Sequence, residues 1–149
     1  MVLKVVCLIL AVIATANAVV FSKCDQDPEA VKVVIDNCND NYCEVKRSQP
    51  AKMEVTFKTA KQATELTGTI HALINGVWIP WPMGAAGKVC RNLSKGQCPV
   101  AENTEATYAV SIKVPFVAPV GTKTVVQIRI SDQDKTVVAC TRIPVLVAA

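Results

Sequence analysis

Few side chains in this sequence are of the types that carry out catalysis or bind metals. The single histidine, His71, lies on the polar side of a run in which apolar and polar residues alternate. No serine sits in a GxSxG motif and no glycine-rich phosphate loop is present, so neither a hydrolase nor a nucleotide-binding enzyme is indicated. Asp132 and Asp134 lack the spaced oxygen ligands of a calcium loop and are better explained by a turn. We therefore expect no enzymatic activity, no metal site and no cofactor.

Cysteines are the other reactive set. Beyond the N-terminal segment there are six of them: Cys24, Cys38, Cys43, Cys90, Cys98 and Cys140. The sequence has no CxxC motif and a single histidine, so a zinc site is not favoured. An even number in a secreted chain predicts a disulfide framework, although six cysteines allow about 15 connectivities. Proximity favours local loops from Cys38 to Cys43 and from Cys90 to Cys98, which leaves Cys24 to meet Cys140.

The segment from Gly76 to Met83 is the candidate for binding. It contains both tryptophans of the chain, Trp78 and Trp81, together with Pro80 and Pro82. Because proline cannot donate to a sheet ladder, the segment must leave the sheet or run along its edge, and we expect it to carry the tryptophans off the sheet. The tryptophans then either cap the core or form an apolar gate at the mouth of a ligand cavity.

The N-terminus predicts secretion. Lys4 precedes an apolar run that ends in Ala16-Asn17-Ala18, so residues 1–18 are predicted to be a signal peptide cleaved after Ala18. Removing 18 of the 149 residues leaves one domain, 19–149, with 15 basic and 12 acidic side chains. These basic residues are too dispersed to indicate nucleic-acid binding, but they permit weak attraction to anionic membranes. No later stretch is long and apolar enough to span a bilayer. We expect a soluble, secreted monomer, either extracellular or in the lysosomal lumen.

Short strands must position these residues. Apolar and polar side chains alternate with period two over residues 31–36, 52–58, 66–74, 107–114 and 125–131, and a last strand is expected from Thr136 to about Leu146. Asn75-Gly76 and the polar run 131–135 predict turns. No convincing helical period is present. About seven strands without helices predict a two-sheet β-sandwich, although the tryptophan of a true immunoglobulin domain would lie within a strand between two bridged cysteines.

Several short motifs in a fixed order resemble one known family. They are the six-cysteine order, Cys38-(x)4-Cys43-Glu-Val-Lys, the run from His71 to Pro82 with its Pro-aromatic-Pro core, Cys98-Pro99, Lys113-Val-Pro115 and Cys140-Thr-Arg-Ile-Pro144-Val. Together they are similar to the ML lipid-recognition family, and within it to the secreted Niemann-Pick type C carriers and their arthropod relatives. The resemblance covers essentially the whole mature chain.

The resemblance implies an all-β, immunoglobulin-like sandwich whose two sheets splay apart to hold a lipid in an apolar cavity. It also implies three disulfides, Cys24–Cys140, Cys38–Cys43 and Cys90–Cys98. The family's residues at the cavity mouth fall by position on Trp81, on Phe116 and near Pro119. The full expected ligand-binding set is Trp81, Phe116, Trp78, Pro119, Val114, Phe57, Ile70 and Tyr108. Such a site needs no reactive group, since burying apolar surface stabilises a complex by roughly 25 cal/mol per Å².

The expected function is that of a secreted lipid-binding and transfer protein, which carries a sterol or a similar hydrophobic ligand to a membrane or a receptor. The alternative is a recognition protein that presents a fatty acid, a semiochemical or a microbial lipid to a sensory or immune receptor. Asn92-Leu93-Ser94 matches the glycosylation sequon, so Asn92 is predicted to carry a glycan.

Overall fold

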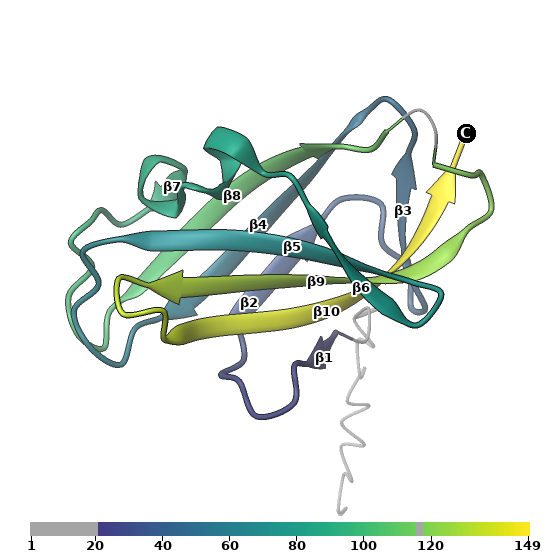
Figure 1. Ribbon diagram of the computed structural model, residues 1–149. Helices are drawn as coiled ribbons and strands as arrows, with labels where there is room; N and C mark the ends of the chain where they lie inside the picture. The colour runs from purple at the N-terminus through teal and green to yellow at the C-terminus, as the bar shows by residue number, and fades with distance from the viewer. Residues whose placement is uncertain (1–20, 116–117) are drawn as a thin grey trace, which may run out of the picture.

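The computed structural model describes residues 21–115 and 118–149, and these form two packed β-sheets (Figure 1). The strands are β1 (Ser22–Lys23), β2 (Lys32–Ile35), β3 (Cys43–Lys46), β4 (Pro50–Lys58), β5 (Leu66–Ile74), β6 (Val77–Trp81), β7 (Leu93–Lys95), β8 (Glu105–Lys113), β9 (Lys123–Asp132) and β10 (Val137–Ala148). Two short 3-10 helices, η1 (Gly84–Gly87) and η2 (Val89–Arg91), lie between β6 and β7. The predicted signal peptide, 1–18, lies outside the described residues.

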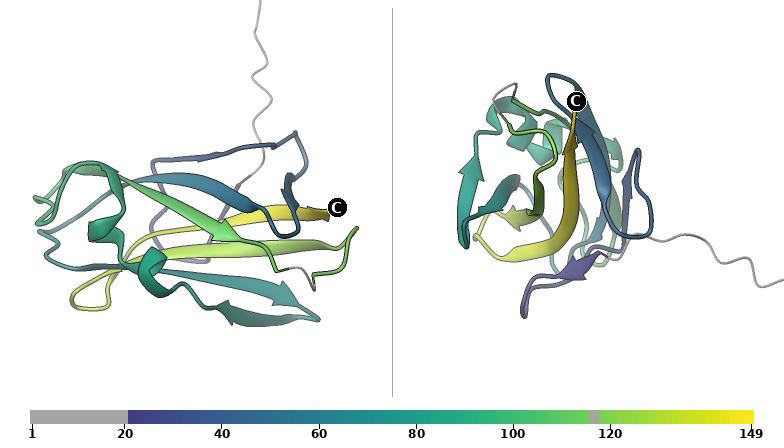
Figure 2. Two further views of the ribbon diagram at one scale, coloured as in Figure 1. Left: turned by 90° about the horizontal axis from the view of Figure 1, so that it is seen from above. Right: turned by 90° about the vertical axis from the view of Figure 1, so that its right-hand side faces the viewer.

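The six-stranded sheet has the order β1-β10-β9-β5-β6, and β3 also pairs with β10. The four-stranded sheet has the order β2-β4-β8-β7. All pairings between these strands are antiparallel except that of β3 with β10, which is parallel. Figure 2 shows the two sheets as facing layers. Their inward side chains form the core, with Phe57, Tyr108 and Ile128 among the largest that are fully buried.

The two-sheet sandwich confirms the predicted fold class. Every strand expected from period-two alternation is present, and the polar run after β9 forms the expected turn, with the Asp132 carboxylate accepting from the backbone N–H groups of Asp134 and Thr136. Three short strands, β1, β3 and β7, were not expected. β1 and β7, with two and three residues, are too short to show a periodic pattern, and the four residues of β3 depend on pairing with the distant end of β10.

The proline-containing segment runs along the edge of the six-stranded sheet. Trp78 pairs with Leu73 and Trp81 with Ile70, so the expectation that the prolines carry both tryptophans off the sheet is wrong. Pro80 is tolerated because β6 is an edge strand, where one row of backbone N–H groups has no neighbouring strand to bond. Asn75 and Gly76 have φ values of 49° and 78°, which fit the two-residue hairpin turn that joins β5 to β6.

Three disulfide bonds join Cys24 to Cys140, Cys38 to Cys43 and Cys90 to Cys98, the pairs that the resemblance implied. The first bond fastens β1 to β10, and the second lies beside β3. In the described residues, no helix has the length and apolar character needed to cross a membrane.

Candidate functional site

A cavity of about 540 Å³ lies between the two sheets at one end of the sandwich. Its walls come from the last residues of β5, the first residues of β9, the end of β10 and the segment after β8, which meet at the right-hand end in Figure 1. The apolar side chains on its wall are Ile35, Val45, Ala51, Met53, Ile70, Ala72, Leu73, Ile74, Trp81, Ile112, Val114, Pro115, Ala118, Pro119, Val126, Ile143, Val145 and Val147, together with Cys43.

Strand alternation explains why the cavity is apolar. Successive side chains of a strand point to opposite faces, so Ile143, Val145 and Val147 of β10 all face inward. At the opposite end of the sandwich the equivalent space is filled, because Phe57 and Tyr108 lie there with no exposed surface. The cavity is therefore the part of the intersheet space that side chains leave open.

Four of the expected ligand-binding residues line this cavity: Trp81, Ile70, Val114 and Pro119. Trp81 is half-buried and packs against the core cluster, directly across from Ile70 on the neighbouring strand. Phe116 lies outside the described residues. Trp81 and Ile70 line the cavity from the six-stranded sheet, and Val114 and Pro119 line it from the segment that follows β8.

Trp78 does not line the cavity. It is three positions from Trp81 in the same strand, and an odd spacing turns the two rings to opposite faces of the sheet. On that outer face, the Arg142 guanidinium lies 5.1 Å from the centroid of the Trp78 ring, and Arg142 Nε donates to Gln127 Oε1 over 3.0 Å. Trp78 thus covers the outside of the sheet.

Phe57 and Tyr108 also lie away from the cavity. Both are fully buried in the closed end of the sandwich. The Tyr108 hydroxyl donates to the backbone oxygen of Ala86 in η1, and burial raises the pKa of Tyr108 to about 12. These aromatic side chains fill the core and determine where the cavity ends.

Residues that the sequence reading missed supply most of the lining. Ala72, Val126 and Val145 belong to strands that were expected, and their inward direction follows from alternation. The alternation pattern does not give the distance between the two sheets at each position. It therefore cannot distinguish residues that line the cavity from residues that fill the core.

Large aliphatic side chains are exposed around the cavity mouth. Ile74, Val77 and Ile79 of the β5–β6 hairpin are 51%, 58% and 43% exposed, and Val120 in the segment before β9 is 49% exposed. Ile74 itself lines the cavity, and Val77 pairs with it across the hairpin. The apolar wall therefore continues onto the surface of the protein.

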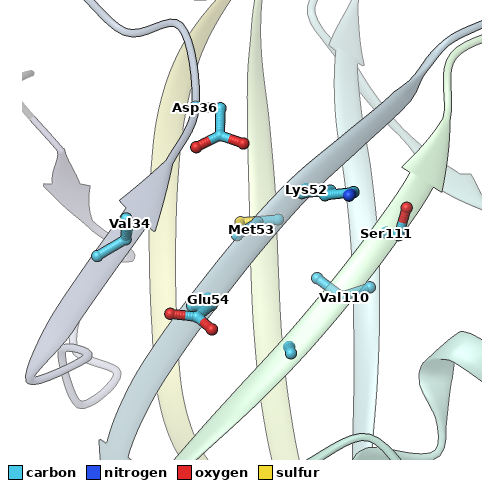
Figure 3. A pocket seen from close by; sticks show the side chains of 8 residues that line it. Val34, Asp36, Lys52, Met53, Glu54, Val110 and Ser111 are labelled. Atoms are coloured by element: carbon cyan, nitrogen blue, oxygen red, sulfur yellow. The ribbon is translucent and has the colours of Figure 1, made fainter. Parts of the chain in front are cut away.

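A second, shallower pocket of about 350 Å³ lies on the four-stranded sheet, and strands of the other sheet pass behind it in Figure 3. Its lining mixes apolar, basic and acidic side chains: Val34, Asp36, Lys52, Met53, Glu54, Ala109, Val110 and Ser111. This surface lacks the continuous apolar wall of the intersheet cavity.

The other candidate chemical residues lie outside the cavity. Asn92 Nδ2 donates to the backbone oxygens of Ala85, at 3.0 Å, and Lys88, at 2.8 Å, and so joins the two 3-10 helices. His71 is half-buried on the outer face of β5, between Pro80 and Gln127 on the neighbouring strands. The described residues contain no group of three or more His, Cys, Asp or Glu side chains placed to hold a metal ion.

A sandwich with an apolar cavity between its sheets defines a lipid-binding protein, in which hydrophobic enclosure replaces catalytic groups. The chain belongs to the ML domain family, whose model matches residues 18–147. Proteins of this family bind lipids and are not enzymes.

Similar sequences and a similar solved structure cover most of the chain. The mite group 2 allergen Tyr p 2 of Tyrophagus putrescentiae is 28% identical over 131 residues, which cover 88% of each chain. The NPC intracellular cholesterol transporter 2 of Mus musculus is 23% identical over 145 residues, 95% of each chain. Among solved structures, a Niemann-Pick type C2 protein from the Japanese carpenter ant superposes with a TM-score of 0.75 at 17% identity, covering 86% of this chain and 98% of that one.

Proposed function

We propose that this protein is a secreted lipid carrier that holds one hydrophobic ligand between its sheets and transfers it to a membrane or a receptor. The observation that carries the proposal is the intersheet cavity, about 540 Å³ in volume with an almost continuous aliphatic wall. That volume lies within the range of roughly 300–1,000 Å³ found for small-molecule sites. The relative named as a cholesterol transporter supports a sterol or a molecule of similar size as the ligand.

The exposed aliphatic rim supports transfer. Ile74, Val77 and Val120 are about half exposed at the mouth, where a ligand leaves or enters. Contact between such a rim and a lipid surface keeps the ligand from crossing bulk water, which would cost about 0.8 kcal/mol for each exposed CH₂ group. Secretion is part of the proposal and depends on the predicted signal peptide, 1–18.

The proposal can be tested with a substitution that fills the cavity. Ala72 faces into it from near the end of β5, so Ala72→Phe places a ring in the space that a ligand would occupy. We expect Ala72→Phe to fold and to lose binding of a fluorescent sterol and a fluorescent fatty acid by at least about tenfold. The matched control is Ala109→Phe, which makes the same change in the shallow pocket on the four-stranded sheet and should bind as the wild type does.

Binding is measured by titrating the delipidated proteins, and transfer by following the probe from protein to vesicles. Equal binding by Ala72→Phe and the wild type would exclude the intersheet cavity as the site. If the wild type bound both probes but delivered neither to vesicles, the protein would be a binding or display protein and not a carrier.

A further inference from the structure

The shallow pocket of about 350 Å³ on the four-stranded sheet has no part in the proposed lipid binding. Side chains alternate along a strand, so Lys52 and Glu54 of β4 point outward while Met53 between them is buried. On the neighbouring strand β8, Ala109 lies across from Glu54. Ser111 lies across from Lys52 in the same way. Because alanine and serine have short side chains, a hollow remains beside the longer side chains of β4.

The charged groups of this pocket are not used by the protein itself. One row further along the same two strands, the hydroxyl oxygens of Thr56 and Thr107 lie 2.9 Å apart, so these polar groups hydrogen-bond to each other. Asp36, Lys52 and Glu54 of the pocket have no ion-pair partner within the described part of the chain. Their charges are therefore available to a ligand.

The two signs of charge lie on opposite sides of the pocket. In Figure 3 the carboxylates of Asp36 and Glu54 lie on the side of β2, and the Lys52 side chain points the other way, toward Ser111 of β8. Lys52 and Glu54 are two positions apart in one strand, so their Cα atoms are separated by about 7 Å. Val34 pairs with Glu54 and is 43% exposed, which adds an aliphatic surface.

From this arrangement we infer a second binding site, which takes a small zwitterion, namely an amino acid with an aliphatic side chain. The ammonium group of the ligand faces the two carboxylates, and its carboxylate faces Lys52 and the Ser111 hydroxyl. Its side chain covers Val34 and Ala109. The volume of the pocket lies at the lower end of the roughly 300–1,000 Å³ found for small-molecule sites. The inference does not depend on the lipid-binding function.

The affinity of such a site is limited by its exposure. Water and salt screen an exposed ion pair, so each pair strengthens binding by at most about fivefold. We therefore expect a Kd on the order of 1 mM. A ligand that carries both charges should still bind more tightly than a ligand of the same shape that carries one, because only the first can form both ion pairs.

The test compares three ligands with the same aliphatic group: leucine, isocaproate, which lacks the ammonium group, and leucinamide, which lacks the carboxylate. Each is titrated into the isotope-labelled protein at about pH 6.5, where carboxylates and amines are both ionised. We expect leucine to shift the backbone amide NMR signals of Lys52, Glu54 and Ser111, and to bind about threefold more tightly than either analogue. This preference should shrink in about 1 M salt, where the screening length falls to about 3 Å.

Single variants assign each end of the ligand. Lys52→Gln should weaken leucine binding about threefold and should not weaken leucinamide binding, because leucinamide has no carboxylate to lose a partner. Glu54→Gln should weaken leucine binding but not isocaproate binding. The matched control is Lys58→Gln/Glu105→Gln, which removes one charge of each sign from a directly paired position on the same two strands and should keep the affinity for leucine.

Two phenylalanine variants separate this site from the intersheet cavity. Ala109→Phe fills the shallow pocket and should abolish the leucine-dependent shifts, while the dispersion of its other amide signals shows that it is folded. Ala72→Phe fills the intersheet cavity and should bind leucine as the wild type does.

Absence of these amide shifts at leucine concentrations about tenfold above the expected Kd would overturn the inference, as would equal affinities for the three ligands. Leucine binding that is lost in Ala72→Phe and kept in Ala109→Phe would place the ligand in the intersheet cavity and contradict a second site. Phosphoethanolamine bound more tightly than leucine would assign the pocket to a lipid head group and overturn the amino-acid class. None of these results bears on lipid binding, which the fluorescent probes test separately.

Discussion

At the scale of single residues, the two tryptophans of β6 have separate roles because they face opposite sides of one sheet. Trp81→Ala should weaken binding of a fluorescent sterol by at least about tenfold while lowering the free energy of unfolding by less than the roughly 3 to 5 kcal/mol of a core truncation, since Trp81 is half-buried. Trp78→Ala should remove the contact with Arg142, worth about 0.5 to 1 kcal/mol, and leave binding within about twofold.

Both quantities come from urea unfolding and probe titration of the delipidated variants. A Trp81→Ala protein that unfolds readily but binds normally while folded would make Trp81 an ordinary core residue and remove its role at the mouth.

Because the phenol of Tyr108 is buried, we expect the free energy of unfolding to fall at high pH. Burial raises its pKa from 10.0 to about 12, so between these values the unfolded chain has released the phenol proton and the folded chain still holds it. Because the unfolded state then binds fewer protons, the free energy of unfolding falls as pH rises from about 10 to 12, by on the order of 2 to 3 kcal/mol. In Tyr108→Phe this decline should be absent. Parallel stability curves for the two proteins over pH 9–12, measured with urea, would contradict the assignment.

Asn92 offers a test that separates a structural role from glycosylation. Asn92→Ala and Ser94→Ala both destroy the sequon, but only the first removes the two hydrogen bonds to Ala85 and Lys88. We expect Asn92→Ala to cost about 1 to 3 kcal/mol of unfolding free energy and Ser94→Ala less than about 0.5. Equal costs would mean that the bonds contribute nothing, and the masses of the secreted proteins show whether a glycan is attached at all.

At the scale of elements, the disulfide between Cys24 and Cys140 holds β1, which pairs with β10 through two residues only. The bond closes a loop with a sequence separation of 116, whereas the Cys90–Cys98 bond closes one of 8. Chain entropy gives about 5 kcal/mol for the long loop and about 2.5 for the short one. Replacing each pair by alanines should therefore lower the urea midpoint more for Cys24 and Cys140. A larger loss from the short loop would show that native packing, not chain entropy, governs both.

The strands that could be predicted from the sequence are those long enough to repeat the alternation two or three times, such as β4, β5 and β9. β3 could not be found this way, because its four residues depend on parallel pairing with the distant end of β10. For the site, the proline-aromatic-proline pattern located Trp81, and spacing along the strand would have excluded Trp78. Phe57 and Tyr108 show the limit of the method: alternation gives their direction, but the width of the gap between the sheets depends on all the side chains that fill it.

At the scale of the whole molecule, the sandwich has a closed end and an open end. Phe57 and Tyr108 pack the closed end without exposed surface, while about 540 Å³ remains unfilled at the other. The long β4–β8 and β9–β10 pairings stabilise each sheet internally, and the buried core of the closed end holds the two sheets against each other without side chains in this space. The fold can therefore persist when no ligand is bound, which the proposed transfer of a ligand would require.

Unfilled space of this size makes the volume of the protein depend on its load. The inner wall offers few groups that could hydrogen-bond water, so its deepest part should stay dry in the delipidated protein and collapse on unfolding. Hydrostatic pressure favours the state of smaller volume, and the volume change on unfolding grows with the void that unfolding removes. Delipidated wild type should accordingly unfold at lower pressure, and with a more negative volume change, than the lipid-loaded protein. Ala72→Phe, which fills the cavity without any ligand, should resemble the lipid-loaded protein in both quantities. Tryptophan fluorescence recorded under increasing pressure would give the unfolding pressure and the volume change of each protein.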